Sequence, residues 1–332
     1  MTPGAFRLFR ALAEGKPLNG MSYAAEAGIS RSAVWKQIEQ LRRAGLPVVA
    51  VRGSGYCLAW PIGLVVPDEI RRAAGSPDVS IDVVDCTEST NRDLSEHFVH
   101  RRVRVAEYQA AGRGRRGRGW ISPPGCGAYF SFGFRFDCGL QRLGALSLVA
   151  GVVVAEVVAD EGIPVMLKWP NDLLVGGAKL GGLLVEIRGA SEGPCEVVAG
   201  IGINVRLPRG ETASCGFIAP DQAWTDLYAA ASGGRHSETG AGGGFDRNRL
   251  IGRLAGALNR AFAQFEREGF GPFMPRWRAL DALDDREVRV TFGDGSVLDG
   301  VAAGVDEQGQ LRLRCADGIR LVNAGEVSVR GV

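Results

Sequence analysis

Apolar residues recur at helical spacing near the start of the chain, over residues 5–45. The pattern predicts a helix over 5–13 that stops at Gly15, since glycine is favoured just past a helix C-terminus. A second short helix is expected around 22–27, followed by a tight turn and a third helix. Three short helices with such a turn are typical of a helix-turn-helix.

The third helix is the best marked of the three. Ser30 is a suitable N-cap for it, and it should extend to about Gly45. One of its faces is apolar and consists of Val34, Ile38 and Leu41. Two short apolar runs then flank a glycine-containing turn within residues 48–58, which predicts a β-hairpin wing after the helix-turn-helix.

Beyond a proline-bounded linker at 61–67, the pattern mixes periods of two and of 3.6 residues. Alternation predicts strands over 81–85, 128–136, 165–169, 180–187 and 195–205. Longer apolar stretches predict helices over 143–160 and 250–265. The apolar face of the second of these helices is formed by Leu250, Leu254, Leu258, Phe262 and Phe265. From about residue 286 onward, short alternating runs between Asp-Gly and Gln-Gly turns predict a small β-barrel.

The chain has 332 residues, of which 45% are apolar and 23% charged. This composition is ordinary for a globular protein, and the length predicts two or three domains. The net charge of +2 is small, but residues 1–60 hold eight Lys/Arg against three Asp/Glu, and residues 101–120 hold seven Arg against one Glu. Such patches favour anionic partners such as nucleic acid or nucleotide phosphate; a solvated charged face has the same composition.

Seven cysteines are scattered along the chain without a CxxC pair, and the three histidines add no metal-ligand cluster. We therefore expect neither a disulfide framework nor a zinc site, which favours a cytoplasmic protein. The N-terminus lacks the apolar core of a signal peptide. The most apolar stretch, residues 143–155, is shorter than the roughly 20 residues that cross a bilayer, and it should be a buried helix.

The most unusual segment is GRGRRGRGW at residues 112–120, with four arginines and four glycines. A segment of this composition buries little and repels itself, so it is unsuited to a packed core. An anion would account for it, because glycines let backbone N–H groups approach a carboxylate or phosphate and guanidinium groups supply matched donors. Disordered basic tails that bind nucleic acid have similar sequences, but this segment lies between two strand-like stretches, which favours an ordered anion-binding loop.

Three other strings contain candidate polar residues. KWPNDLLVGGAKLGGLLVE (168–186) predicts strands around a Gly-Gly hairpin, with Lys179 beside small glycines where a ligand can approach. A lysine in a strand also commonly points to water, so spacing alone leaves both interpretations open. GIGIN (200–204) ends a strand but lacks the GxGxxG pattern of a dinucleotide site. ESTN (88–91) is by itself a plausible helix N-cap.

In order and spacing, however, the strings ESTN, EYQAAGRGRRGRGW, KWPNDLL, KLGGLLVE and GIGIN together resemble the signature blocks of the biotin–protein ligases. The resemblance extends over nearly the whole chain. The N-terminal helix-turn-helix with its GSGY wing and the small C-terminal barrel resemble the bifunctional bacterial form of this family, which is also the biotin operon repressor. The middle blocks are specific as a set, whereas winged helices are widespread.

The resemblance implies an α+β protein with three domains. These are a winged helix-turn-helix DNA-binding domain (1–62), a central mixed α/β ligase domain with a β-sheet and helices (63–282), and a small SH3-like β-barrel (283–332). It implies an ATP-dependent biotin–protein ligase, which forms biotinyl-5′-AMP from biotin and ATP. The biotin then passes to a lysine of the biotin carboxyl carrier protein of acetyl-CoA carboxylase. ATP and biotin would be substrates, Mg²⁺ the metal ion, and no membrane partner is implied.

Two anions react in the first step of such an enzyme, so cationic and backbone donors must offset their repulsion. The family pattern makes Lys179 and Arg115 the catalytic residues, with Lys179 reaching the biotin carboxylate and the α-phosphate. The residues implied to bind biotin are Ser89, Thr90, Asn91, Gln109, Arg113, Gly114, Arg115 and Lys179. Those implied to bind ATP or the adenylate are Arg116, Arg118, Trp120, Lys168, Asn171, Asp172, Asn204 and Trp224, with Asp172 as the Mg²⁺ ligand.

The second implied activity is repression of biotin biosynthesis genes on operator DNA, by a homodimer that forms when the adenylate is bound. The residues implied to bind DNA are Ser30, Arg31, Ser32, Trp35, Lys36 and Arg52. Those on the third helix would enter a major groove and the one on the wing would reach phosphate. A helix-turn-helix that merely supports the enzyme is the alternative.

Two other functions fit parts of the pattern: a regulator that senses biotin without catalysis, and a lipoate–protein ligase. The intact arginine/glycine loop and Lys179 favour catalysis, and GRGRRGR with ESTN favours biotin. Two features depart from the family pattern. Gly119 stands where a basic residue is frequent, so the loop has one cation fewer, and the Gly/Ser-rich stretch 229–245 looks like an insertion that should form a surface loop.

Overall fold

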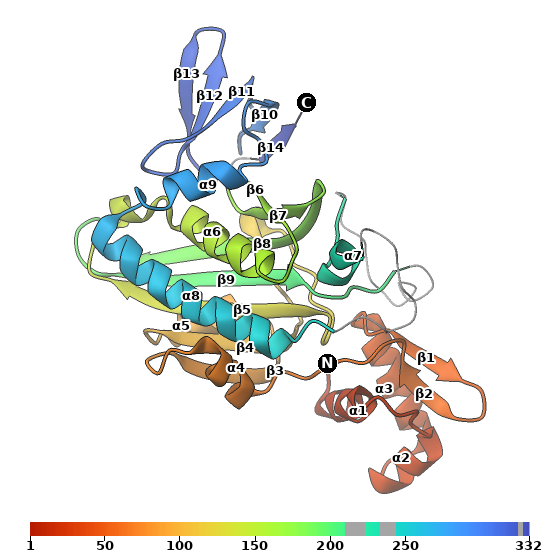
Figure 1. Ribbon diagram of the computed structural model, residues 1–332. Coiled ribbons are helices and arrows are strands. Elements are labelled where there is room, and N and C mark those ends of the chain that lie inside the picture. The colour runs from red at the N-terminus through yellow and green to blue at the C-terminus, as the bar shows by residue number, and fades with distance from the viewer. Residues whose placement is uncertain (210–222, 233–243, 325–327, 332) are drawn as a thin grey trace.

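Three β-sheets follow one another along the chain in a computed structural model that describes residues 1–209, 223–232, 244–324 and 328–331 (Figure 1). A two-stranded sheet belongs to the N-terminal helical segment, a seven-stranded sheet to the central segment and a five-stranded sheet to the C-terminal segment. The mixed α+β class expected from the sequence is confirmed. Most of the predicted surface loop over 229–245 lies outside the described residues.

The N-terminal segment contains α1 (Pro3–Ala13), α2 (Gly20–Glu26), α3 (Arg31–Arg43), β1 (Val48–Val51) and β2 (Gly55–Leu58). The predicted helix-turn-helix and wing are thereby confirmed. The Ser30 side chain accepts a hydrogen bond from the backbone N–H of Ala33, which is the predicted N-cap. The predicted apolar face of α3 is fully buried against α1 and α2, so this segment has a small core of its own.

The central segment begins with α4 (Pro67–Ala74), β3 (Ser80–Thr87), α5 (Thr90–Glu96), β4 (Arg102–Gln109), η1 (Arg115–Gly117), β5 (Gly127–Phe136), η2 (Leu140–Leu143) and α6 (Leu146–Ala159). It continues with β6 (Met166–Lys168), β7 (Asp172–Val175), β8 (Ala178–Gly189), β9 (Cys195–Asn204), α7 (Leu227–Ala231), α8 (Arg247–Glu268) and α9 (Met274–Leu280). The strands form one sheet in the order β3-β4-β5-β9-β8-β7-β6, in which only the β3–β4 pair is parallel.

The two faces of this sheet have different coverings because side chains alternate along each strand. On β5, Phe132, Phe134 and Phe136 pack against Phe262 of α8. Ser131, just before them, lies on the other face, where its hydroxyl meets residues at the start of α5. Helices α6 and α8 thus cover one face and α5 covers the other, and only the α5 face carries buried polar side chains of β5.

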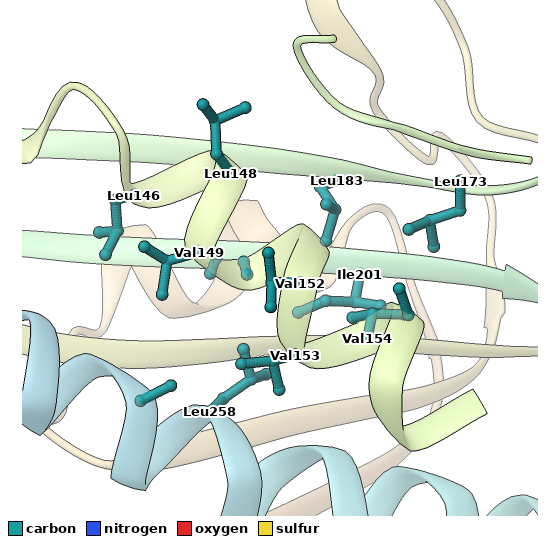
Figure 2. Close-up of a cluster of buried hydrophobic side chains, with 14 of the residues drawn as sticks. Leu146, Leu148, Val149, Val152, Val153, Val154, Leu173, Leu183, Ile201 and Leu258 are labelled. Atoms are coloured by element: carbon teal, nitrogen blue, oxygen red, sulfur yellow. The ribbon is translucent and has the colours of Figure 1, made fainter. Parts of the chain in front are cut away.

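Helix α6 is apolar on all sides because it lies between the sheet and α8 (Figure 2). Its residues contact Leu183 and Ile201 of the sheet on one side and Leu258 of α8 on the other (Figure 2). By length and composition alone the stretch Leu140–Ala159 could cross a membrane, but 72% of its most apolar window is buried inside the fold. The prediction of a buried helix is confirmed.

The C-terminal segment forms an antiparallel sheet in the order β13-β12-β11-β10-β14. Its strands are β10 (Glu287–Thr291), β11 (Val297–Val305), β12 (Leu311–Cys315), β13 (Gly318–Val322) and β14 (Ser328–Gly331). Among the described residues β13 and β14 are edge strands that do not pair with each other, so the predicted barrel is seen here as a curved open sheet with a bulge in β11.

The linker between the first and second sheets is hydrogen-bonded into the central segment. Glu107 and Arg247 form a buried ion pair, and the same two side chains bind the backbone of Val65 and Gly63. Asn248 likewise binds the backbone of Leu64 and Val66. Residues 63–66 are therefore anchored by buried charged and amide side chains of the central segment.

A second contact joins Trp60, just before the linker, to the chain leaving β9. The guanidinium of Arg206 lies between two aromatic rings, 4.6 Å from the ring centre of Trp60 and 4.7 Å from that of Tyr228. Its neighbour Leu207 lines the large cavity described below. The N-terminal segment thus contacts the chain one residue away from the cavity wall.

Candidate active site

The large cavity of the central sheet, about 1000 Å³, opens on the face that carries α5. It is bounded by the N-terminus of α5, the arginine/glycine loop, the β6–β7 turn and the ends of β8 and β9. All residues that the sequence resemblance assigned to biotin, ATP or the adenylate line this one cavity. The strings that carry them lie far apart in the sequence, and the sheet topology brings them together.

The arginine/glycine loop closes on itself at its base. The backbone N–H of Trp120 donates to the carbonyl of Gly112 at 2.7 Å, and that of Gly114 donates to the carbonyl of Arg118 at 2.7 Å. Gly112 has no room for a side chain, since a Cβ there would lie 2.4 Å from the Trp120 carbonyl oxygen. The tip is sharply turned, with Arg116 at φ 57°, a backbone conformation that few residues other than glycine adopt. The loop is ordered, as predicted.

The four arginines of the loop do not have equal surroundings. Arg113, Arg116 and Arg118 are exposed, whereas Arg115 is half-buried and donates to the Asn171 Oδ1 atom at 3.3 Å. Burial lowers the pKa of Arg115 from its usual value, and the nearby Asp172 carboxylate partly opposes that effect. Arg115 is therefore the loop cation that is already directed into the cavity.

Two glycines of the GIGIN string lie at the floor of the cavity, where their lack of a side chain leaves room for Asn91 and Trp120. A Cβ on Gly200 would lie 2.1 Å from the Asn91 Oδ1 atom, and one on Gly202 would lie 2.5 Å from the indole ring of Trp120. Both distances are too short for any real contact. The string that looked weak by itself therefore has a steric reason for its glycines.

Lys179 reaches the cavity through an irregularity in the sheet. Strict alternation would place Lys179 on the same face as Gly181 and Leu183, and the Leu183 side chain is buried beneath α6 (Figure 2). The β7–β8 register shifts between Leu173 and Leu174, which is the effect of a one-residue bulge. The bulge moves Lys179 to the cavity face, where Gly182 lies beneath it.

The Lys179 ammonium is paired with Asp172. Nζ lies 2.5 Å from the Asp172 Oδ1 atom and 5.8 Å from the ring centre of Trp120. The side chains of both charged residues are about one-fifth exposed, so the pair is partly shielded from solvent. Next to it, the Asn171 amide donates to the Leu183 carbonyl at 2.7 Å, which leaves its oxygen to face Arg115. The Arg115 guanidinium and the Lys179 ammonium therefore both lie at the floor of the cavity, beside Asn171 and Asp172.

The inner end of the cavity holds a network of uncharged polar groups. The Gln109 Oε1 atom accepts from the backbone N–H of Thr90 at 3.0 Å, and Gln109 Nε2 donates to the Ser122 hydroxyl at 2.9 Å. Thr90, Asn91 and Ser89 are almost fully buried. Such buried, hydrogen-bonded groups suit a neutral polar ligand better than an anion.

The outer end is closed by the segment around Trp224. This residue pairs in parallel with Lys179 in an isolated bridge, and the guanidinium of Arg209 lies 4.2 Å from the centre of its ring. The Asn204 amide donates to the Thr225 carbonyl at 2.9 Å. Val329, from the C-terminal sheet, also lines the cavity. A flat aromatic surface beside cations is suited to a purine base.

The residues that bear on the cavity but were not predicted are mostly glycines and interior polar groups. They include Ser122, Ser131, Gly182, Glu186, Gly200, Gly202, Leu207 and Val329. The glycines of KLGG and GIGIN were visible as a pattern. Ser131 and Leu207 have no sequence signal, since each lies in an otherwise ordinary segment.

Within the described residues, no group of three or more His, Cys, Asp or Glu side chains is placed to hold a metal ion. Asp172 is the only carboxylate among the described residues that line the cavity. Mg²⁺ commonly binds proteins through one or two carboxylates together with substrate phosphates. The donor set therefore fits a Mg²⁺ ion that arrives on a nucleotide, and it does not fit a resident metal centre.

The predicted DNA-binding residues form a second candidate site on the N-terminal segment. Arg31, Ser32, Trp35 and Lys36 are all exposed on α3, opposite its buried face, and Trp35 is 55% exposed. Ser30 lies at the start of the same helix, and Arg52 is exposed at the turn of the wing. An exposed tryptophan between basic residues is an unusual surface unless a partner covers it.

Comparison with known proteins places matches along the whole chain. Residues 83–204 match the biotin/lipoate A/B protein ligase family, residues 285–330 match the biotin protein ligase C terminal domain, and residues 5–57 match an HTH domain. The bifunctional ligase/repressor BirA of Salmonella typhimurium is 38% identical over 327 residues, which cover 97% of this chain and 96% of that relative. The protein of the same name from Escherichia coli is 36% identical over 326 residues, with 98% and 96% covered.

A solved structure also matches most of the chain. The biotin protein ligase from Aquifex aeolicus in complex with biotin and ATP superposes with a TM-score of 0.61 at 26% sequence identity. The match covers 76% of this chain and 99% of that one. About three quarters of this chain is therefore similar in fold to a protein whose structure contains both ligands.

Proposed function

The chain belongs to the biotin–protein ligases of the bifunctional ligase/repressor type, and from this premise we propose that it activates biotin with ATP, transfers it to a carrier protein and represses transcription. The observation that carries the enzymatic part is the convergence of Lys179, Arg115 and the uncharged inner network in one cavity. The carrier is the biotin carboxyl carrier protein of acetyl-CoA carboxylase.

Two substitutions make up the reaction. An oxygen of the biotin carboxylate attacks the α-phosphorus of ATP, and pyrophosphate leaves. The amine of the carrier lysine then attacks the acyl carbon of the mixed anhydride, AMP leaves, and the amine loses a proton. In the first step two anions approach each other, so the repulsion and the charge of the pentavalent transition state must be offset by fixed donors.

The cavity supplies those donors at the position where the two anions would meet. Lys179 would exchange Asp172 for the carboxylate and α-phosphate oxygens, since both are within the reach of one flexible side chain. Arg115, oriented by Asn171, would contribute a second cation. Thr90 and Gln109 would bind the ureido ring at the inner end, and Trp224 would pack against adenine at the outer end.

Mg²⁺ would enter with ATP as part of the substrate and would neutralise charge on the phosphates. Asp172 and Asn171 would be the residues of this chain that hold it. The Asp172 carboxylate would become available to the ion if Lys179 turned to the substrates.

The ligase proposal is tested by incubating a carboxyl carrier domain with this protein, biotin and Mg·ATP and measuring its mass. We expect an increase by one biotinyl group, and an unchanged mass would overturn the proposal. Lys179→Ala should slow adenylate formation by at least about 100-fold, the effect of removing one transition-state donor. Arg115→Gly should instead release the adenylate into solvent, which chromatography of the supernatant detects. Lipoate in place of biotin should give no product.

We propose that the N-terminal segment binds operator DNA. Its support is the exposed basic and aromatic surface of α3 and the wing. Gel shifts on a palindromic site, with biotin and ATP present, should show a specific complex that Trp35→Ala weakens and Lys36→Ala weakens on all sequences alike. A protein that biotinylates its carrier but gives no specific shift at moderate salt would be a ligase whose helix-turn-helix is only supportive.

The domain limits that follow from this proposal are 1–62, 63–282 and 283–332, with the last as an SH3-like unit. Two-fold symmetric operator binding would require a homodimer, formed when the adenylate is bound. Sedimentation velocity with and without the adenylate tests this, and a monomer in both states would contradict it. Both activities belong to the cytoplasm, where the carrier and the DNA are found.

A further inference from the structure

Glu186 is a carboxylate on β8 that the proposed reaction does not use. Along this strand Gly182 and Leu184 line the cavity, and alternation places Glu186 on the same face, two residues beyond Leu184. Its Oε1 atom lies 3.0 Å from the Arg113 Nη2 atom, and its Oε2 atom accepts a hydrogen bond from the Asn91 amide at 3.0 Å. Both carboxylate oxygens therefore have partners, and one partner is the first arginine of the arginine/glycine loop.

The ion pair between Glu186 and Arg113 joins the loop to the sheet. A backbone bridge pairs Arg113 with Gly119 across the base of the loop, between the two hydrogen bonds that close it. These bonds make residues 112–120 a single unit. A contact that fixes Arg113 therefore also fixes the direction of Arg115, the loop cation that points into the cavity.

The loop is attached to the rest of the site through side chains at two places. At one of them Arg115 donates to the Asn171 amide oxygen at 3.3 Å. At the other Arg113 meets a carboxylate, and its Nη1 atom also lies 3.5 Å from the Glu186 Oε2 atom. A contact between opposite charges includes a Coulomb attraction that a contact with a neutral amide lacks. The attachment at Glu186 should therefore hold the loop more firmly than the one at Asn171.

We propose that Glu186 is a positioning residue that holds the arginine/glycine loop closed over the adenylate. The inference rests on the proposed ligase function, and it adds a residue outside the cavity that sets how long the intermediate is retained before the carrier lysine arrives. The adenylate leaves only when the loop lifts from the cavity, and lifting separates the Arg113 guanidinium from the Glu186 carboxylate. The strength of that ion pair therefore enters the rate of release directly.

The direct test follows the release of adenylate that the protein has made in its own site. The protein is incubated with biotin, pyrophosphatase and Mg·ATP radiolabelled at the α-phosphate, and the loss of protein-bound label is then measured in excess unlabelled biotin and ATP. Glu186→Gln keeps the size of the side chain and removes its charge. We expect release to become about 2- to 5-fold faster, the effect of losing one partly exposed ion pair. Chromatography should identify the released label as intact biotinyl-5′-AMP.

A double-mutant cycle shows whether the effect acts through Arg113 or through Asn91, the two partners of Glu186. In the Arg113→Gln background the ion pair is already absent, so adding Glu186→Gln should change the release rate very little. Ionic strength gives a second readout, because salt screens a partly exposed pair. The release rate of Glu186→Gln divided by that of the wild type should fall toward one as salt is raised to about 1 M. A structural defect would persist at high salt.

The matched control is Glu96→Gln, the same change at a carboxylate whose ion pair with Arg92, at 2.9 Å, lies within α5. This variant should release the adenylate at the wild-type rate. Thermal denaturation identifies any variant that fails to fold. Glu186→Asp, whose shorter side chain draws the charge back from Arg113, then replaces Glu186→Gln with the same direction of change expected.

Wild-type release from Glu186→Gln would overturn the proposal. An equal increase in the wild-type and Arg113→Gln backgrounds would also overturn it, because the effect would then act through Asn91. If Arg113→Gln forms too little adenylate to follow, the salt series decides, and a ratio of release rates that does not change with salt counts against the ion pair. A wild-type protein that forms no adenylate would instead refute the proposed function, so the two failures give different results.

Discussion

Gly202→Ala tests whether the floor of the cavity is set by the contact between β9 and Trp120. The added Cβ would lie 2.5 Å from the indole Cε2 atom and 2.6 Å from Nε1, whereas ordinary contact begins at about 3.4 Å. The ring must therefore recede by roughly 1 Å, or the strand must bend. The ring cannot move freely, because the Trp120 backbone is hydrogen-bonded to Gly112 at the base of the arginine/glycine loop.

The expected cost follows from this geometry. Overpacking by one methyl group typically costs about 1–3 kcal/mol. Part of this cost would appear as lower folding stability and part as weaker binding of the ligand. If about half appears in binding, KM for biotin rises roughly 3- to 10-fold, since about 1.4 kcal/mol corresponds to tenfold. The displaced ring also moves the loop that carries Arg115, so the rate of pyrophosphate exchange should fall as well.

The assay is biotin-dependent pyrophosphate exchange together with thermal denaturation. Gly271→Ala is the matched control, because a Cβ there meets nothing within 4 Å and the residue has no left-handed backbone. This control should keep wild-type kinetics and an equal or slightly higher melting temperature. If Gly202→Ala matched the control in both measurements, the explanation of the GIGIN glycines by close packing would be refuted.

Three further predictions concern the regions around the cavity. Burial raises the pKa of Asp281 from 3.8 to about 6. The side chain's contribution to stability is therefore fully present below pH 3.8, where it is protonated in both states, and it is lost as the pH rises through about 6. Asp281→Asn should therefore raise the free energy of unfolding by about 3 kcal/mol at pH 8 and little near pH 4, and an equal gain in urea titrations at both pH values would contradict this. Arg247→Met leaves the Glu107 carboxylate buried without its ion-pair partner and should cost about 3–5 kcal/mol of stability, measured by urea unfolding. Adding Glu107→Gln should restore part of this loss in the double variant. If the two single losses simply added, the two residues would not be stabilising each other. Trp60→Ala removes one of the two rings around Arg206 and should lower the free energy of unfolding by about 1 kcal/mol and raise KM for ATP a few-fold. An unchanged KM for ATP would show that the contact stabilises the fold without affecting the cavity.

The elements with long, regular patterns were predictable from the sequence, and so were the residue types of the site. The apolar face of helix α8 consists of five residues at helical spacing along 250–265, and α3 combines a capping serine with an apolar face. Short elements were missed: α4 has eight residues and α9 has seven, and each begins around a proline. In such segments packing against neighbours decides the structure, and local pattern carries little information.

The position of Lys179 shows why the rest of the site could not be predicted. Alternation alone places it with Leu183 on the core face, and the bulge that moves it depends on how β7 and β8 pair. Ser131 is similar, because its hydroxyl donates to the Asn91 Oδ1 atom, 40 residues away in the sequence. A sequence specifies such pairs only through the whole fold, so resemblance to a family pointed to Lys179 as a candidate catalytic residue before any physical argument could.

The hydrogen bonds of residues 63–66 have a consequence for dividing this protein into working parts. Those four residues follow the helix-turn-helix, yet their backbone amides and carbonyls are bound by Glu107, Arg247 and Asn248 of the catalytic segment. A shortened enzyme that starts at Pro67 would leave three buried polar side chains facing solvent-filled space, whereas one that starts at Gly63 keeps them satisfied. Residues 63–66 therefore fold with the catalytic segment, and a ligase fragment that folds on its own should begin at Gly63, four residues before helix α4.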